Sequence, residues 1–397
     1  MSGRLCVCEN VLVAGDMLLA LISSLMTPVS SSLTHYFTCR HGFEAPLIAE
    51  LERLPSDGAR ATSPCPGAVR LDGDDLPGLP DPTYALQILP DVREVRAPST
   101  KKLAIAAAEC VIDHFASDLD GAPRGSLDMH VLVPDLLRGV PPNKAKLLRR
   151  GQDVADQMRA LLRKRFAAAR PVQGSASTDR PDQVLLLQCL LLSPETLSVS
   201  ICRADQTACG LGFWPARTPA GFVDTSLDGF MPSSAYRKLL EAFACLGLQP
   251  ARGSRCVDLG ACPGGWTAAL RRLGCVVTAV DRQPLDDSLM KDFDVEFVQG
   301  DAFAFAPDAP VEWAVSDVIA FPERCVHLMG RWTEGRWAQH LVFTMKFKGD
   351  EPDFDAIEAA RKVAQQHGFA CRSKHFFSNK NEITLMASRG SRDPALG

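Results

Sequence analysis

Residues 257–266, VDLGACPGGW, combine residue types that suit a ligand-binding turn. An apolar run carrying Asp258 breaks at Gly260 into a glycine-rich loop, and glycine permits tight turning and close approach of a ligand to the main chain. The spacing matches neither the G-x-G-x-x-G of dinucleotide folds nor a phosphate loop ending in Lys-Ser/Thr, so it disfavours phosphate binding. Cys262 has no histidine or other base placed with it, which argues against a nucleophilic role.

Three aspartates follow apolar runs that read as successive strands: Asp281 in AVDRQ, Asp301 in QGDAF and Asp317 in AVSDV. Asp281 lies about 20 positions after the glycines, where a carboxylate can bond ribose hydroxyls. Asp301 is placed to contact an adenine amino group. A single aspartate more often caps a strand or helix, but three at successive strand ends favour a site. The acidic strand ends suit a ligand that carries adenosine, and the glycine turn does not suit phosphate. Together they indicate S-adenosylmethionine as the ligand.

Three further charged residues stand near the same strand ends. Lys346 ends an apolar run in VFTMKFKGDEPDFD and is expected to face the same rim as Asp317. Lys238 lies in PSSAYRKLLEAF, before the first strand, and Glu382 opens the last strand in NKNEITLMAS. Taken one at a time, each is equally well explained as an ordinary surface charge.

The elements that must position these residues begin near residue 216. Near-continuous apolar runs alternate with amphipathic segments, which is typical of a parallel, doubly wound sheet covered by helices. Helices are expected at 233–248, 265–273, 321–330 and 353–367. Strands are expected at 255–261, 275–284, 295–302, 311–318, 340–347, 369–377 and 382–388.

The front of the chain predicts two smaller units. Residues 33–98 are expected to form a small α+β domain, with a strand, glycine turn and helix at 35–54 and a loop at 71–92 that holds one strand near 84–89. Residues 99–215 are expected to form a second unit, with a Ser99-capped helix at 99–115. A strand at 127–135, a basic helix at 144–170 and strands at 183–192, 196–204 and 209–215 complete it.

Length and charge bound the class of protein. A chain of 397 residues exceeds one ordinary core and indicates two or three domains. The net charge of −4 gives no sign of a nucleic-acid partner, but residues 144–170 hold nine Lys/Arg against two Asp. That segment is either a solvated helix face or a polyanion-binding face. The fourteen cysteines show no Cys-x-x-Cys pair and no Cys/His cluster, so we expect no metal site and a reducing compartment.

The first 32 residues form an uncertain N-terminal extension. Residues 11–26 are apolar but interrupted by Asp16, and they fall short of the roughly 20 residues of a membrane span. Arg4 is the only basic residue before them, which makes a poor signal or transit peptide. The extension is either an added helix, a degenerate presequence or the product of a start codon upstream of Met26.

The motifs together resemble the FtsJ-type RNA ribose 2′-O-methyltransferases, which carry a Lys-Asp-Lys-Glu tetrad. Lys238, Asp317, Lys346 and Glu382 fall at the matching places. The chain is still more similar to the bacterial ribosomal RNA large subunit methyltransferase M family, in which Cys-Pro-Gly-Gly-Trp-Thr is the usual first motif. The segment FTCRHGFEAPLIAEL resembles that family's beginning, and residues 99–215 are compatible with its THUMP-like RNA-binding region. The resemblance spans about residues 35–388 and is most specific in the methyltransferase domain.

The resemblance implies a role for each matching residue. The S-adenosylmethionine pocket would be lined by Cys262, Pro263, Gly264, Gly265, Asp281, Asp301 and Asp317. Lys346 would be catalytic, with Lys238, Asp317 and Glu382 completing the tetrad. The family has a serine before the first tetrad lysine where this chain has Ala235, so that serine's contact to the methionine part of the cofactor is in doubt.

The implied fold is α/β: a C-terminal, doubly wound Rossmann-like methyltransferase domain at 216–397, preceded by the α+β domain at 33–98 and the THUMP-like region at 99–215. The implied reaction transfers a methyl group from S-adenosylmethionine to a ribose 2′-hydroxyl, that of a cytidine in large-subunit ribosomal RNA. We expect a cytoplasmic monomer with no metal and no membrane association. The basic helix, with Lys374, Lys380 and Arg389, is expected to hold RNA phosphates.

Two features of the reaction stay open at this point. Lys346 can accept the hydroxyl proton only if its amine is neutral; otherwise it orients the hydroxyl while the proton leaves late. The substrate is alternatively a tRNA or an RNA cap, and a non-catalytic RNA-binding assembly factor is a separate alternative. A small-molecule methyltransferase would leave the basic segment without use.

Overall fold

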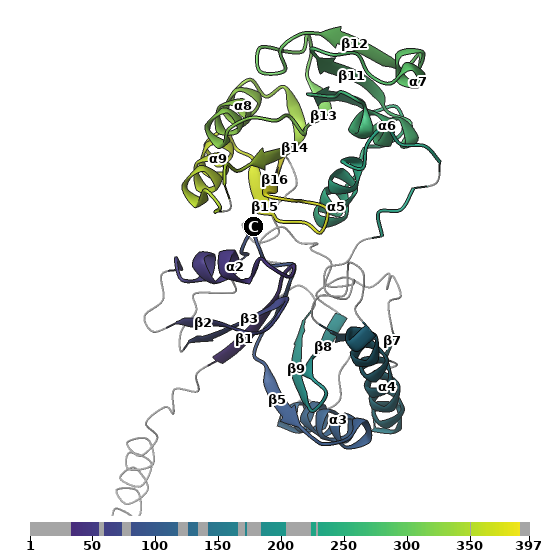
Figure 1. The fold of residues 1–397 in the computed structure, drawn as a ribbon, viewed down its shortest axis with the longest axis vertical. Coiled ribbons are helices and arrows are strands. Elements are labelled where there is room, and N and C mark those ends of the chain that lie inside the picture. The colour runs from purple at the N-terminus through teal and green to yellow at the C-terminus, as the bar shows by residue number, and fades with distance from the viewer. Residues whose placement is uncertain are drawn as a thin grey trace, which may run out of the picture.

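The computed structural model describes residues 33–54, 59–73, 81–117, 126–133, 142–165, 171–172, 184–203, 224–227, 229–349 and 351–389. The expected extension at 1–32 and the expected strand at 209–215 lie outside these ranges. Three sheets organise the described chain. In Figure 1 the largest sheet and its helices fill the upper part of the view, and the two smaller sheets lie below it.

The largest sheet has seven strands in the order β12-β11-β10-β13-β14-β16-β15. They are β10 (Arg255–Leu259), β11 (Val276–Asp281), β12 (Val295–Gln299), β13 (Val311–Ser316), β14 (Ala338–Lys346), β15 (Ala370–Lys374) and β16 (Glu382–Ser388). Neighbours are parallel from β12 to β14, and β16 runs antiparallel to both β14 and β15. The predicted Rossmann-like, doubly wound sheet is confirmed. The order of strands reverses direction at β10 and β13, which is where such sheets bind ligands.

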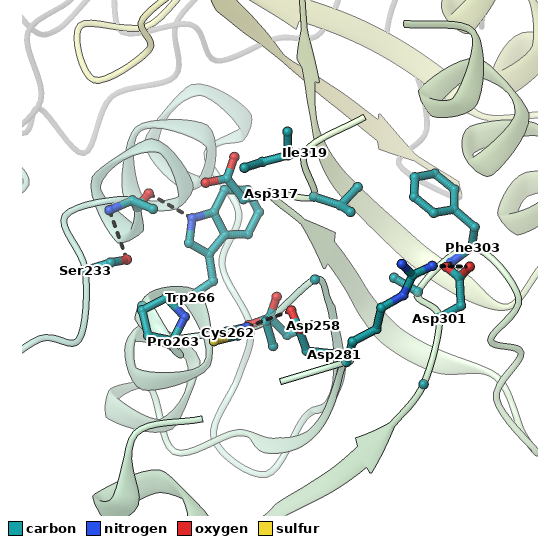
Figure 2. A pocket seen from close by; sticks show the side chains of 18 of the residues that line it. Ser233, Asp258, Cys262, Pro263, Trp266, Asp281, Asp301, Phe303, Asp317 and Ile319 are labelled. Carbon is teal, nitrogen blue, oxygen red and sulfur yellow. Dashed lines mark hydrogen bonds and ion pairs between the residues drawn. The ribbon is translucent and has the colours of Figure 1, made fainter. Parts of the chain in front are cut away.

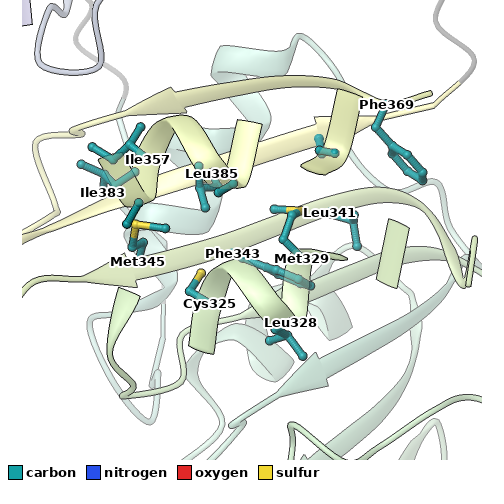
Figure 3. Packing of buried hydrophobic residues seen from close by; sticks show 14 of the residues in the cluster. Cys325, Leu328, Met329, Leu341, Phe343, Met345, Ile357, Phe369, Ile383 and Leu385 are labelled. Atoms are coloured by element: carbon teal, nitrogen blue, oxygen red, sulfur yellow. The ribbon is translucent and has the colours of Figure 1, made fainter. Parts of the chain in front are cut away.

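Helices cover both faces of this sheet: α5 (Tyr236–Leu246), α6 (Gly265–Arg272), α7 (Asp287–Met290), α8 (Pro322–Glu334) and α9 (Phe354–Gln366). Successive residues of β14 point to opposite faces, as a pleated strand requires. Phe343 and Met345 pack in the cluster with residues of α8 and α9, whereas Val342 packs with residues of α5 and α6. Figure 3 shows Met329 of α8 and Ile357 of α9 in the first cluster.

The first of the smaller sheets has the order β2-β3-β1-β4. Its elements are β1 (Leu33–Thr38), α2 (Glu44–Leu51), β2 (Arg60–Cys65), β3 (Ala68–Gly73) and β4 (Gln87–Leu89). The expected strand and helix at 35–54 and the strand near 84–89 are present. The β2–β3 hairpin was not predicted, because RATSPC is mostly polar and includes a proline, both poor strand signals.

The second small sheet has the order β5-β9-β8-β6-β7. Its elements are β5 (Arg93–Arg96), α3 (Thr100–Ser117), β6 (Ser126–Leu132), α4 (Pro142–Arg165), β7 (Pro171–Val172), β8 (Val184–Ser193) and β9 (Thr196–Arg203). Helices α3 and α4 share one apolar cluster with the sheet. Ser99 Oγ accepts from the Lys102 N–H at 3.3 Å, as expected of an N-cap. The domain boundaries near residues 98 and 215 stay predictions.

An ion cluster joins the first sheet's domain to the seven-stranded sheet. Asp81 Oδ2 lies 2.5 Å from Arg372 Nε, and Asp81 Oδ1 lies 2.5 Å from Lys374 Nζ. Lys374 Nζ also donates to the Pro82 oxygen at 2.6 Å, and the side chain is 2% exposed. The expectation that Lys374 contacts phosphate is therefore wrong, because its ammonium is buried between two domains. Within the described ranges, no helix is long and apolar enough to cross a membrane.

Candidate active site

The four tetrad residues come together at the carboxyl end of the large sheet. Lys238 Nζ lies 2.7 Å from both carboxylate oxygens of Asp317 and 3.0 Å from Glu382 Oε1. Lys346 Nζ donates to the main-chain oxygen of Asp317 at 2.9 Å. It lies 3.3 Å from Asp317 Oδ1 and 3.9 Å from Glu382 Oε2. Two lysines and two acidic residues thus form one cluster.

Four elements position this group. Lys238 occupies the first turn of α5, whose apolar side packs on the sheet. Lys346 ends β14 and Glu382 begins β16, and the antiparallel register pairs these two residues directly. Asp317 follows the last residue of the neighbouring strand β13. The sheet order therefore brings together residues that are up to 144 positions apart.

A cavity of about 460 Å³ opens beside the tetrad. This size suits a ligand such as a nucleoside derivative. Of the tetrad, Asp317 and Lys346 line the cavity, while Lys238 and Glu382 lie behind them and are buried. The other predicted cofactor residues that line it are Cys262, Pro263, Gly265, Asp281 and Asp301. Gly264 does not line it and is the N-cap residue of α6.

The glycine-rich loop fits tightly against the next strand. Gly260 has φ +74°, a conformation that L side chains rarely adopt. A Cβ added there would lie 2.9 Å from the Cβ and 3.1 Å from the Cα of Val318. Val318 follows Asp317 and also lines the cavity. The glycine therefore allows the loop after β10 to approach the segment that carries a tetrad residue.

Two predicted carboxylates, Asp281 and Asp301, line the cavity (Figure 2). Asp281 Oδ2 accepts from the Cys262 N–H at 3.0 Å, and Asp281 Oδ1 accepts from the Gln283 N–H at 2.9 Å. Asp301 accepts from the Phe303 N–H at 2.9 Å and from Arg282 at 2.9 Å. The Phe303 N–H and then Arg282 lower the pKa of Asp301, so it is a carboxylate at neutral pH.

Asp258 is a fourth carboxyl that lines the cavity, and the sequence did not single it out as a site residue. It is 1% exposed, and its Oδ2 accepts from Thr267 Oγ1 at 2.7 Å. Burial, opposed by the hydrogen bond from Thr267 and assisted by the nearby Asp317 and Asp281, raises the pKa of Asp258 to about 7. Several carboxyls around one cavity favour a ligand with positive charge. The available signal was its place at the end of the apolar run, directly before the glycine loop.

The resembled family has a serine at the position of Ala235, which contacts the methionine part of the cofactor. In this chain Ser233 lies near that position. Ser233 lines the cavity, and its Oγ accepts from the Ala235 N–H at 3.3 Å. A Cβ added at Gly265 would lie 2.1 Å from this Oγ, so the hydroxyl sits against the glycine loop. The Ala235 carbonyl oxygen accepts from Trp266 Nε1 at 2.8 Å. A serine hydroxyl thus lies at the cavity two positions before Ala235 in the sequence.

Cys262 lines the cavity without an activating neighbour. Its side chain is exposed, and slight burial and then Asp281 raise its thiol pKa. A raised pKa leaves less thiolate at neutral pH, which argues against a nucleophile. No group of three or more potential metal ligands gathers in the part of the chain that the structure describes.

The predicted phosphate contacts are spread over the molecule. Lys380 is exposed beside the tetrad, whereas Arg389 follows the opposite end of β16. On α4 the described basic side chains that are exposed are Lys146, Arg149 and Arg163. Arg159 is instead 2.6 Å from Asp156, an exposed acid of the same helix. The polyanion-binding role of this helix stays a prediction.

Comparisons with known proteins agree with this geometry. Residues 231–344 match the model of a family described as FtsJ-like methyltransferase. A protein of Halorhodospira halophila named "Ribosomal RNA large subunit methyltransferase M" is 34% identical over 189 residues, which is 47% of this chain and 56% of that protein. The matched region thus spans about half the length of that relative.

Two broader matches cover most of the chain. A Xanthomonas campestris pv. campestris protein of the same name is 28% identical over 376 residues, covering 89% of this chain and 98% of that protein. Among solved structures, TrmN from Thermus thermophilus covers 90% of this chain and 100% of its own, at 15% identity and a TM-score of 0.30. That structural score is too low to bear on function.

Proposed function

Because residues 231–344 are an FtsJ-like methyltransferase domain and relatives named as ribosomal RNA methyltransferases align with it, we propose that this protein methylates ribosomal RNA. The methyl group comes from S-adenosylmethionine, and the acceptor is the ribose 2′-hydroxyl of a cytidine in the large-subunit RNA. The buried thiols of Cys256 and Cys325 suit a reducing compartment, so we place the reaction in the cytoplasm. The observation that carries the proposal is the tetrad at the edge of the carboxyl-rich cavity.

The cavity residues suit S-adenosylmethionine. Asp281 and Asp301 would hold the hydroxyl and amino groups of the adenosine, and Ser233 with the main chain of the glycine loop would hold the methionine part. The acidic lining fits a ligand that carries a sulfonium and an ammonium group. When bound, S-adenosylmethionine supplies an activated methyl group, so the protein's main task is to position the acceptor.

The two lysines of the tetrad have different roles: Lys238 fixes the carboxylates, and Lys346 acts on the substrate. The three N–H donors of Lys238 are matched by three carboxylate oxygens within 3.0 Å, so this side chain fixes Asp317 and Glu382. Lys346 is held less tightly by the same carboxylates and faces the cavity. Lys346 Nζ is therefore the group that meets the 2′-hydroxyl.

The proton of that hydroxyl must leave as the new bond forms. The 2′-oxygen bonds the methyl carbon while the carbon–sulfur bond breaks, and the O–H proton passes to Lys346 Nζ if the amine is neutral. If Lys346 is protonated, it orients the hydroxyl and the proton passes to solvent later. Either way, Asp317 and Glu382 fix the direction in which Nζ points.

The test compares Lys346→Met with Lys362→Met, a control at an exposed lysine of α9. Tritium transfer from S-adenosylmethionine to large-subunit RNA should fall about 100- to 10,000-fold in Lys346→Met, because a positioned proton acceptor is lost. Calorimetry should find cofactor affinity nearly unchanged in both variants. Transfer by Lys346→Met at the wild-type rate would contradict the assignment.

The substrate is tested separately. Wild-type protein should place a 2′-O-methyl group on a cytidine of large-subunit RNA, mapped by mass spectrometry of nuclease fragments. Transfer RNA and capped RNA serve as competing substrates. Transfer to either of these and not to ribosomal RNA would overturn the substrate while keeping the reaction.

A further inference from the structure

The loop after Asp317 exposes two bulky apolar side chains beside the tetrad. Ile319 is 86% exposed and Phe321 is 58% exposed. Ile319 lines the same cavity as Asp317 and Lys346, and Figure 2 shows it close to Asp317. Large apolar groups that are gathered at the edge of a site, and not scattered singly, mark a surface that another molecule covers.

The backbone holds Phe321 in one conformation. Phe321 is the N-cap residue of α8, with φ −67° and ψ 152°, and Pro322 follows it in the first turn. A residue before proline is restricted to extended conformations, so the loop cannot easily withdraw the ring. The ring is thus presented to solvent by a rigid helix start. Little freedom would be lost when a flat partner covers it.

One exposed cation lies over this ring, and a second lies near the same end of the neighbouring strand pair. Lys348 Nζ lies 5.7 Å from the centroid of the Phe321 ring. Lys348 follows the end of β14 by two residues, and Lys380 precedes the start of its antiparallel partner β16 by two residues. The Phe347 N–H donates to the Asn381 oxygen at 3.2 Å, which continues the pairing toward both lysines. Both lysine side chains are exposed.

An unstacked nucleotide satisfies all three features. RNA recognised in a single-stranded loop presents unstacked bases, and such a base needs a new stacking surface. Bases stack readily on aromatic side chains whatever their identity. The neighbouring phosphates would then meet the two lysines. A protein partner would not require Lys348 and Lys380 to be aligned with the tetrad.

We propose that Phe321, with Ile319 beside it, is the platform on which the base of the target nucleotide stacks, and that Lys348 and Lys380 hold its flanking phosphates. This assignment rests on the proposed function, because it takes the RNA ribose to the tetrad. It adds Phe321, Lys348 and Lys380, none of which lines the cofactor cavity, to the residues that contact the substrate.

The matched variants are Phe321→Ala and Phe293→Ala, the latter at a fully exposed phenylalanine between α7 and β12. Phe321→Ala should lower kcat/KM for ribosomal RNA roughly 5- to 100-fold, from the loss of one stacked base. Phe321→Trp should restore most of it. Phe293→Ala should behave as wild type, and all three should bind S-adenosylmethionine normally. Lys348→Ala should reduce the slope of RNA affinity against salt concentration by about one.

The outcomes separate the two proposals. If wild-type protein methylates no RNA, the proposed function fails before the platform is tested. If wild-type protein is active and Phe321→Ala equals Phe293→Ala on naked RNA, the platform assignment is wrong. A defect of Phe321→Ala on assembled ribosomal particles alone would also overturn it, because the patch would then bind protein.

Discussion

At the scale of single residues, burial decides which charged groups do chemistry and which hold structure. Lys238 and Lys346 have the same side chain and share two carboxylates, yet Lys238 is enclosed and Lys346 faces the cavity. Lys374 is the contrasting case, since its ammonium is buried between domains and has no path to RNA. Residue type and spacing located all three lysines, but only the fold separates their roles.

Asp258 makes a prediction about pH. Burial raises the pKa of Asp258 to about 7, so the folded state takes up its proton more readily than the unfolded chain. Its contribution to the free energy of unfolding is complete below about pH 4 and is lost as pH rises through about 7. The amide of Asp258→Asn does not titrate, so the variant does not lose this contribution to the free energy of unfolding as the pH rises. The melting temperature of the cofactor-free variant should therefore exceed that of wild type at pH 8.

The check is a series of thermal unfolding curves at pH 5, 6, 7 and 8. The difference between Asp258→Asn and wild type should grow with pH across the series. Asp355→Asn, at a side chain that is 90% exposed, serves as the control and should follow wild type. A constant difference between Asp258→Asn and wild type at every pH would show that Asp258 does not titrate in this window.

At the scale of elements, the repeating strand–helix pattern of the sequence predicted most of the strands and helices. Every predicted strand and helix from residue 233 to 388 is present, because apolar strands buried on both faces leave an unmistakable run in the sequence. The insertion of β16 antiparallel between β14 and β15 was not predicted. Pairing order depends on contacts between distant segments, which no local pattern encodes. That order pairs Lys346 with Glu382.

The candidate site was predictable where a residue belonged to a recognisable motif or stood near a strand end. Asp281, Asp301 and Asp317 lie at or within two residues of the ends of their strands, and all three line the cavity. Ser233 was missed because it lies before α5, at a different position from the serine of the resembled family. Phe321 was missed because an exposed phenylalanine in a loop looks like core in a sequence.

Gly260 provides a prediction for the loop after β10. Gly260→Ala would force a Cβ against the Cβ and Cα of Val318, which is held beside Asp317. Gly368→Ala is the matched control, because Gly368 has a similar φ of +82° but open space around it. Both variants should lose about 1–2 kcal/mol from the left-handed backbone. Gly260→Ala should lose about 1–3 kcal/mol more through overpacking.

Urea unfolding measures the stability difference, and methyl transfer measures its effect on the site. Gly260→Ala should also lower activity, since Val318 can give way only by moving the segment that carries Asp317. Gly368→Ala should keep the activity of wild type. Equal stability losses in the two variants would mean that the loop relaxes without disturbing Val318.

At the scale of the whole molecule, the front of the chain supports the seven-stranded sheet directly. Thr83 of the first domain bonds Ser373 of β15 at 2.8 Å, and the His375 N–H donates to the Thr83 oxygen at 2.8 Å. His375 also packs against Phe43 in a tilted arrangement, with 3.9 Å between the ring centroids. The segment after β15 leads to Lys380 and Glu382, so this interface steadies one side of the tetrad. Removing the front half would expose buried charge, and point variants are therefore the better probes.

A substitution at Asp81 tests most directly whether the front of the chain supports the seven-stranded sheet. Burial alone would raise the pKa of Asp81, but Arg372 and Lys374 hold it at about 2, so it is a carboxylate throughout the neutral range. Asp81→Ala leaves Arg372 and Lys374, each 2% exposed, without their carboxylate. Breaking a buried ion pair in this way costs about 3–5 kcal/mol, because the remaining charges stay desolvated.

Asp355→Ala is the internal control, because the Arg53–Asp355 pair also joins the two domains but is 54% and 90% exposed. It should cost less than about 1 kcal/mol. Urea unfolding at pH 7.5 measures both free energies, and Asp81→Ala should lose the larger amount together with part of the methyl transfer. Since the pKa of Asp81 is depressed, its stabilisation is present above about pH 4 and disappears as pH falls through about 2. Wild type and Asp81→Ala should therefore converge in acid, and equal losses in the two alanine variants at pH 7.5 would contradict the supporting role of the buried cluster.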